Sequence, residues 1–325
     1  MNMEATLASQ IALAQELLDD KREEWEGRYT QYASAVLSNT DKIVALRKTF
    51  RQWHPLYVYM AIGMAKGSAD TVNLRYRGQK VANIKFKNDE IIIENSYKRD
   101  NEKYFALDFL PEREFLWHGK EATQLRKHFS PTTLYSVKVI EHALESAFIS
   151  ELEKNRRAKK DVHLHNVRPV KLANQYRFQM RTPFAASGSK LEYPKNGGGG
   201  IDLLGRVGKD ASTSLCIFEI KQTTGRACFN AAMIQATAYA VFIQELLASR
   251  CGREWCKIFG FASDKPLRNA LKVCVAMPWN VEKNGVPPQI PSIDTRLGKL
   301  EFCHVLLNED WENGISVKDT NILPQ

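Results

Sequence analysis

Three charged residues, Asp202, Glu219 and Lys221, stand in the second half of the chain where apolar side chains would be expected. The run LCIF at 215–218 is apolar on both faces of a strand, which predicts a central strand covered on both sides. Because side chains alternate along a strand, Glu219 and Lys221 share one face. Charged groups at such a place need partners or a chemical role, since burying them without either is costly.

A predicted hairpin brings the two acids together. A turn centred between Asp210 and Ala211 places Asp202 directly opposite Glu219 on the adjacent strand. Two carboxylates side by side in a partly desolvated pocket repel each other, and a bound divalent cation commonly stabilises them. With the ammonium group of Lys221 beside them, these residues predict a hydrolytic site that uses a divalent cation. The plain alternative is a surface hairpin that carries an ordinary Glu–Lys pair.

The order Asp, then Glu-x-Lys on the next strand, resembles the motif of the PD-(D/E)XK nuclease superfamily. Gln235 and Tyr239 match Gln-x-x-x-Tyr, the signature of its RecB-type branch, and the resemblance implies that they position the site and the substrate backbone. It covers roughly residues 135 to 280. Ile201 stands before the Asp in place of the family's Pro, which is variable in the family. The implied fold is a restriction-endonuclease-like α/β core, a mixed sheet flanked by helices in the order αβββαβ.

The resemblance also implies how a metal would be held. Asp202, Glu219 and the backbone carbonyl of Ile220 would bind Mg²⁺ or Mn²⁺, with water completing the shell, as these oxygen-seeking cations prefer. The ion would polarise the scissile phosphate and lower the pKa of a bound water. Lys221 would orient that water or stabilise the charge that develops on the phosphate.

A helix predicted within residues 136–157 would be the first helix of this core. The family often carries a Glu on this helix that reaches the metal. Glu145 is the candidate, because the stretch ESAFISEL resembles the family's helix at that point; Glu141 and Glu151 are alternatives. Glu145 would contact the ion through water or help to hold a second ion.

Basic residues precede the predicted hairpin. Between residues 154 and 190 the chain has ten Lys or Arg and a single acid, Asp161. This predicts a phosphate-binding track that leads to the site. Its candidate residues are Arg156, Arg157, Lys159, Lys160, Arg168, Lys171, Arg177 and Arg181. For the first of these, the alternative is a set of cations that complement a helix dipole.

The N-terminal part predicts a separate helical and β-meander domain, with a boundary at Ser130-Pro131. The chain is thus divided into residues 1–130, regulatory or binding, and 131–325, the nuclease domain. The predicted elements are helices over 6–37, 41–52 and 120–134, and three strands within 71–98 with turns at 77–79 and 88–89. The first helix carries an apolar stripe that either packs on its own domain or forms a homodimer.

Basic and aromatic residues are interleaved on the predicted meander. They are Arg75, Tyr76, Arg77, Lys80, Lys85, Phe86 and Lys87. One interpretation is nucleic-acid contact, with cations on phosphates and rings on bases. The other is that the rings face a core while the cations face solvent. The residue types alone leave both interpretations open.

Composition agrees with a cytoplasmic, nucleic-acid-binding protein. The formal net charge is +9, and the contents of 44% hydrophobic and 26% charged residues are those of a globular chain. The six cysteines form no C-x-x-C motif, which favours a reducing compartment. We expect no apolar stretch of membrane-spanning length and no signal peptide.

These observations predict a Mg²⁺- or Mn²⁺-dependent deoxyribonuclease, an endonuclease rather than an exonuclease. Phage defence or DNA repair and recombination are the expected settings, and a protein partner that delivers or regulates the enzyme is expected as well. Two alternatives stay open. One is a non-catalytic nucleic-acid-binding or assembly subunit that retains the fold, and the other is an RNA-cleaving nuclease.

Overall fold

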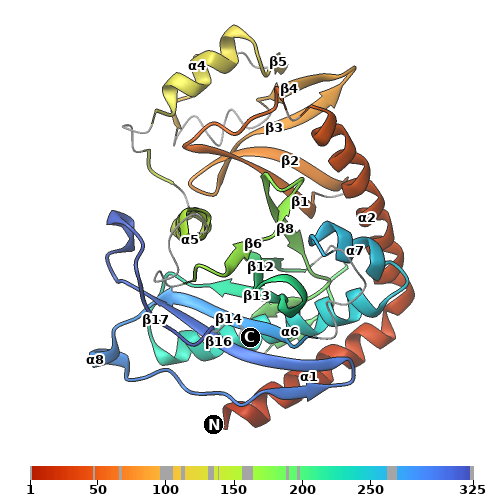
Figure 1. Ribbon diagram of the computed structural model, residues 1–325, viewed down its shortest axis with the longest axis vertical. Coiled ribbons are helices and arrows are strands. Elements are labelled where there is room, and N and C mark those ends of the chain that lie inside the picture. The colour runs from red at the N-terminus through yellow and green to blue at the C-terminus, as the bar shows by residue number, and fades with distance from the viewer. Residues whose placement is uncertain are drawn as a thin grey trace.

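Two mixed β-sheets, a small antiparallel sheet of β9 (Ala185–Ser187) and β10 (Lys190–Glu192), and the helices around them make up the computed structural model, so the chain belongs to the α/β class, as predicted (Figure 1). The structure describes residues 2–46, 48–65, 68–95, 105–110, 114–130, 135–137, 139–155, 164–187, 190–195, 198–261 and 269–322. One helix, α5 (Ile140–Asn155), lies between the two sheets in this view.

The first sheet has the strand order β11-β8-β1-β2-β3-β4-β5, with β7 paired to β8. Its strands are β1 (Leu56–Ala65), β2 (Ser68–Tyr76), β3 (Gln79–Lys87), β4 (Glu90–Glu94), β5 (Glu114–Leu116), β7 (Lys171–Leu172), β8 (Tyr176–Arg181) and β11 (Gly200–Ile201). The predicted meander is confirmed as β2, β3 and β4, with turns at residues 77–78 and 88–89 where the backbone takes positive φ. The sequence did not predict β1, which pairs in parallel with β8.

The second sheet has the order β15-β16-β14-β13-β12-β6, with β17 paired to β16. Its strands are β6 (Val167–Pro169), β12 (Leu203–Val207), β13 (Ser214–Ile220), β14 (Leu271–Pro278), β15 (Ile293–Thr295), β16 (Gly298–Leu307) and β17 (Val317–Thr320). All seven residues of β13 are buried between β12 and β14, which confirms the predicted central strand. β6, β12 and β13 are mutually antiparallel, and β14 joins β13 in parallel after the helix α6 (Arg226–Ala248).

The predicted N-terminal helices have different bounds in the structure. α1 (Met3–Asp20) and α2 (Arg22–Ala45) are separated at Lys21, so the predictions of one helix over 6–37 and another over 41–52 are wrong. The stripe of Leu7, Ile11, Ala14 and Leu18 is buried within the chain, which agrees with the alternative in which it packs on its own domain. The shorter helices are α4 (Lys120–His128), α7 (Gly252–Ile258) and α8 (Val281–Asn284).

The two halves of the chain share one hydrophobic core. Tyr29 of α2 packs against Phe242 of α6 with ring centroids 4.7 Å apart, and Trp255 donates a 3.2 Å hydrogen bond to the carbonyl of Tyr29. The β1–β8 pairing also crosses the predicted boundary at residue 130. In Figure 1, α1 and α2 run along the outside of both sheets. A cut at residue 130 would therefore open the first sheet and expose one side of α6.

The helix α6 is long and apolar enough to pass as a membrane-spanning segment. By length and composition it could cross a bilayer, whereas no such stretch was expected from the sequence. In the structure, however, 83% of its apolar window is buried inside the protein, as in the core helix of a folded domain.

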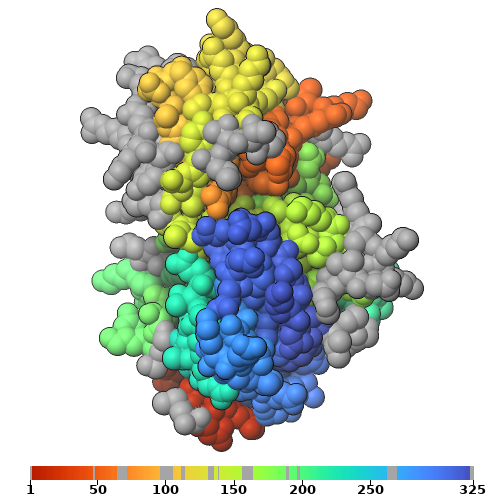
Figure 2. Space-filling view, turned by 90° about the vertical axis from the view of Figure 1, so that its left-hand side faces the viewer, coloured from red at the N-terminus to blue at the C-terminus, as the bar shows by residue number. Residues whose placement is uncertain are grey.

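In the side view of Figure 2, the C-terminal strands, in blue, cover much of the lower half, and the part in yellow around α4 forms the top.

Candidate functional site

The β12–β13 hairpin has the register that the sequence predicted. Leu203 pairs with Phe218 and Val207 with Ser214, around a short 3-10 helix at Asp210–Ser212. Asp202 precedes the first paired residue of β12 and therefore lies opposite Glu219. Since Leu215 and Ile217 lie in the core cluster that α6 covers, alternation puts Glu219 on that same face.

Asp202 takes the place of a backbone partner at the end of the hairpin. The backbone N–H of Ile220 donates a 2.7 Å hydrogen bond to Oδ2 of Asp202. In an extended strand the N–H and C=O of one residue point to the same side, so the carbonyl of Ile220 also points toward Asp202. This brings together the carboxylate and the carbonyl that were predicted to share a metal.

Lys221 lies between two acids. Its Nζ is 2.7 Å from Oε1 of Glu219 and donates a 2.9 Å hydrogen bond to Oε1 of Glu141 on α5. Glu219 is fully buried, yet neither of its carboxylate oxygens receives a hydrogen bond of regular geometry from a described residue. A buried carboxylate with spare oxygens can accept a cation.

The acids of α5 divide into three environments. Glu145, the predicted metal contact, is 7% exposed, and its charge interacts with that of Asp202. Glu141 holds Lys221, as described above. Glu151 forms a 3.4 Å ion pair with the exposed Lys154. The choice of Glu145 over Glu151 thus agrees with the geometry, and Glu141 gains a role that the sequence did not reveal.

Burial controls the ionisation of the site. It raises the pKa of Asp202 to about 6, against the opposing effects of Lys221 and the Ile220 N–H. Burial also raises the pKa of Glu219 well above its usual value, and repulsion from Asp202 raises it further. Burial alone would lower the pKa of Lys221, but Glu219 and Asp202 together raise it. Two acids that resist ionisation beside one firmly charged lysine are typical of functional sites.

Gln235 and Tyr239 lie beside the glycine run that precedes Asp202. Nε2 of Gln235 donates a 3.2 Å hydrogen bond to Oη of Tyr239. A Cβ on Gly199 would lie 2.0 Å from that hydroxyl oxygen, so only glycine allows this approach. Burial, followed by the charge of Glu219, raises the pKa of Tyr239. The predicted pair therefore borders the carboxylates and supports the chain that leads into Asp202.

Only a partial metal-binding set is formed by side chains. Among the residues that the structure describes, no group of three His, Cys, Asp or Glu side chains is arranged to hold a metal ion. Asp202 and Glu219, with the carbonyl of Ile220, offer two carboxylates and one backbone oxygen. Lys221 lies 2.7 Å from Oε1 of Glu219, and burial still keeps the pKa of Asp202 raised. These residues fit a hard divalent cation that keeps several waters.

The predicted phosphate-binding track is only partly described. Arg156, Arg157, Lys159 and Lys160 lie outside the described residues. Arg177 is 1% exposed and cannot meet a phosphate from solvent, so its assignment to the track is corrected.

Two other members of the track keep some exposure. Arg168 is half-buried on β6, beside Arg206 of β12. Arg181 is half-buried at the end of β8. Lys171 forms a 2.6 Å ion pair with Glu153, which offsets its charge. Of the described part of the track, Arg168 and Arg181 are therefore the remaining candidates.

Two basic residues of the meander, Lys85 and Lys87, are paired with acids. Lys85 contacts Glu94 and Glu114, and Lys87 lies 2.7 Å from Glu114. Tyr76 is buried in the core. For these residues, the interpretation with rings inside and cations outside agrees with the structure.

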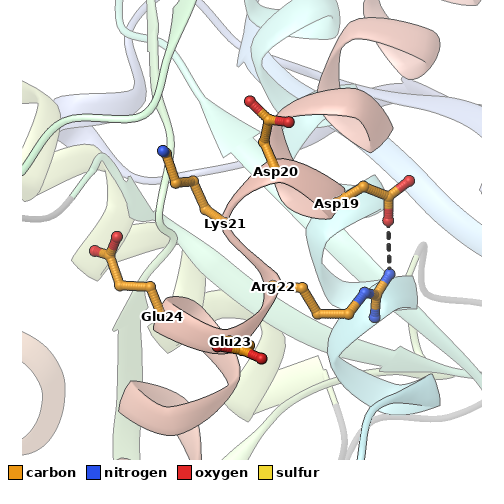
Figure 3. A pocket seen from close by; sticks show the side chains of 6 residues that line it. All are labelled: Asp19, Asp20, Lys21, Arg22, Glu23 and Glu24. Atoms are coloured by element: carbon orange, nitrogen blue, oxygen red, sulfur yellow. Dashed lines mark hydrogen bonds and ion pairs between the residues drawn. The ribbon is translucent and has the colours of Figure 1, made fainter.

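A surface pocket lies away from the candidate site. It has a volume of about 650 Å³ and surrounds the junction of α1 and α2. Figure 3 shows the six charged residues that line it, Asp19, Asp20, Lys21, Arg22, Glu23 and Glu24. Asp19 and Arg22 bind each other at 2.8 Å, and Arg296 binds Asp19 as well. These pairs fasten the helix junction to the C-terminal half, which is a structural role.

No family model matches the chain, and neither a curated protein nor a solved structure matches it. The functional assignment therefore depends on the residues and geometry described above.

Proposed function

We propose that this protein is a metal-dependent nuclease that hydrolyses phosphodiester bonds of DNA. The observation that carries the proposal is the half-buried Asp202 set opposite the fully buried Glu219, with Lys221 2.7 Å from Glu219. A site with two carboxylates, a backbone carbonyl and a lysine suits phosphodiester hydrolysis better than acyl transfer, because no Ser or Cys nucleophile with an adjacent His is among them.

The order of the elements supports the proposal. α5, β6, β12, β13, α6 and β14 occur in this order as helix, three strands, helix and strand, with the short α7 between α6 and β14, and the four strands are neighbours in that order. The same order is implied by the resemblance to the PD-(D/E)XK superfamily. Strands β7 to β11 are inserted between β6 and β12, and β7, β8 and β11 belong to the first sheet.

Each residue has a distinct part in the proposed reaction. Asp202, Glu219 and the Ile220 carbonyl would hold Mg²⁺ or Mn²⁺, with Glu145 reaching it through water. The ion, when bound, supplies Lewis acidity toward the phosphate and a more acidic water. Lys221 stays protonated and stabilises the negative charge that grows on the phosphate oxygens. Glu141 fixes the ammonium group, and Gln235 with Tyr239 supports the backbone before Asp202.

A non-catalytic nucleic-acid-binding subunit is the second candidate. It is favoured by the finding that no three described His, Cys, Asp or Glu side chains form a metal-binding group. Cleavage separates the two functions. Supercoiled plasmid, linear duplex, circular single-stranded DNA and RNA should be incubated with the full-length protein in Mg²⁺, Mn²⁺ or EDTA.

We expect metal-dependent cleavage of DNA that Lys221→Ala abolishes. Cleavage of RNA alone would identify a ribonuclease with the same chemistry. Binding without cleavage in every metal would support the second candidate. Cleavage that persists in EDTA, or in both Asp202→Ala and Lys221→Ala, would contradict the site.

A further inference from the structure

One face of the first sheet is polar, and α5 lies next to it. The strand register and the alternation of side chains put six residues on this polar face: Tyr57 and Tyr59 of β1, Asn73 and Arg75 of β2, and Arg177 and Gln179 of β8. Residues between them, such as Val58, Leu74 and Phe178, point to the other face and join the hydrophobic core. The polar face therefore needs partners of its own.

Arg75 is held on this polar face by neutral groups. Its Nε donates a 2.7 Å hydrogen bond to Oδ1 of Asn73, and its Nη1 donates a 2.9 Å hydrogen bond to Oε1 of Gln179. The guanidinium also stacks over the ring of Tyr59 at 4.5 Å. The residue is buried, with 9% of its surface exposed, and the two hydrogen bonds and the ring contact fix its orientation.

Arg75 lacks the ion pair that a buried arginine usually has. In the part of the chain that the structure describes, the hydrogen bonds of Arg75 run from Nε to Asn73 and from Nη1 to Gln179, and neither acceptor is a carboxylate. Arg177, two strands away on the same polar face, is the contrast, because it pairs with Glu153 and also donates to Ser146 and Ser150. A buried cation without a paired anion is costly, and a bound anion would remove that cost.

The position of Arg75 is next to the carboxylate site. Tyr59, on which it stacks, accepts a 3.0 Å hydrogen bond from Arg177, and Arg177 donates to Oγ of Ser146, the neighbour of Glu145. The turn after β2 also touches α5, since a Cβ on Gly78 would lie 2.2 Å from the carbonyl oxygen of His142. The charges of Arg75 and Glu145 are close enough to interact.

We propose that Arg75 binds a backbone phosphate of the nucleic-acid substrate, beside the carboxylates that would act on the neighbouring phosphodiester. The inference rests on the proposed function for its substrate class. A guanidinium whose planar group is already oriented can offer two N–H donors to phosphate oxygens, and it does so better than a lysine. Such a contact sets the register of the strand and carries no sequence information. It also makes the N-terminal sheet a part of the substrate site.

The test measures binding in EDTA, where no hydrolysis is needed. The affinity of full-length protein for a fluorescent single-stranded DNA of about 20 nucleotides is followed by anisotropy over a series of salt concentrations. Arg75→Met should weaken binding about tenfold and reduce the log–log salt slope by about 0.7. Arg75→Lys should keep the slope and lose part of the affinity. Arg51→Met removes an equal charge from an exposed position before β1 and should change neither quantity.

Wild-type affinity and slope in Arg75→Met would overturn the proposal. If the Met variant does not fold, as judged by circular dichroism, wild-type affinity in Arg75→Lys would overturn it instead. The nuclease assignment fails separately. Weak binding by Arg75→Met together with no cleavage by wild type in any metal would refute the nuclease and leave the phosphate site standing. Metal-dependent cleavage by the wild type, together with unchanged binding by Arg75→Met, would support the nuclease and refute the phosphate site.

Discussion

The carboxylate of Asp202 accepts a 2.7 Å hydrogen bond from the backbone N–H of Ile220, at the point where β12 and β13 stop pairing through their backbones. The Asp202 side chain thus replaces the next backbone acceptor of the strand pair and lies next to the buried Glu219. The hydrogen bond lowers the cost of a charged Asp202, but burial outweighs it, and the pKa stays raised at about 6. The predictions below follow from this balance between burial and compensation.

Asp202→Asn should stabilise the metal-free protein at neutral pH. Asn keeps an acceptor for the Ile220 N–H and removes one of two repelling charges. Because the folded-state pKa of Asp202 is raised from 3.8 to about 6, its destabilising effect is absent below pH 4, builds up between pH 4 and pH 6, and is complete above pH 6. The expected gain above pH 6 is on the order of 3 kcal/mol. Urea unfolding in EDTA at pH 4 and pH 7.5 measures it, and a less stable mutant at pH 7.5 would count against a metal site.

Glu145→Gln and Glu141→Gln should affect metal binding differently. Glu145 is almost buried and interacts with Asp202, whereas Glu141 is half-exposed and bonds to Lys221. We expect Glu145→Gln to weaken Mn²⁺ binding about tenfold, and Glu141→Gln to change it by less than about threefold. Calorimetry on the two variants decides. A larger loss of Mn²⁺ affinity in Glu141→Gln than in Glu145→Gln would show that Glu141, and not Glu145, contacts the metal.

Arg177→Met should unfold the protein more easily, with no specific defect in nucleic-acid binding. The substitution leaves five acceptors without their donor, among them Tyr59, Ser150 and Glu153. The expected loss of stability is about 3–5 kcal/mol. Lys154→Met removes a cation that is 75% exposed and should cost less than about 0.5 kcal/mol. If Arg177→Met is fully stable and binds DNA weakly, Arg177 belongs to the binding track after all.

Gly199→Ala should destabilise the protein because the new methyl group would collide with the hydroxyl group of Tyr239. The new Cβ would lie 2.0 Å from Oη of Tyr239 and 3.1 Å from its Cζ, so the chain before Asp202 or the ring must move. The expected cost is about 1–3 kcal/mol. Adding Tyr239→Phe removes the closest contact and should recover part of that cost, which a double-mutant cycle by thermal unfolding measures. Strictly additive effects of the two changes would show that the contact is not the cause.

The sequence alone determined the local geometry of the candidate site. The apolar run before Glu219 predicted a buried central strand, and the turn at Asp210 fixed a register that places Asp202 opposite Glu219. Both follow from the two-residue period of a strand, which depends only on the chain near each residue. The meander was predictable for the same reason, because its turns carry residues that adopt positive φ.

Only the tertiary structure decided how the halves of the chain meet. The parallel pairing of β1 with β8 joins residues more than one hundred positions apart in the sequence, and no local sequence pattern predicts it. The same pairing buries Arg177, which composition had suggested for the phosphate-binding track, and puts Arg75 beside α5. Charge counts cannot distinguish a cation in solvent from one that is buried and paired. That distinction depends on which strands become neighbours, and long-range packing decides it.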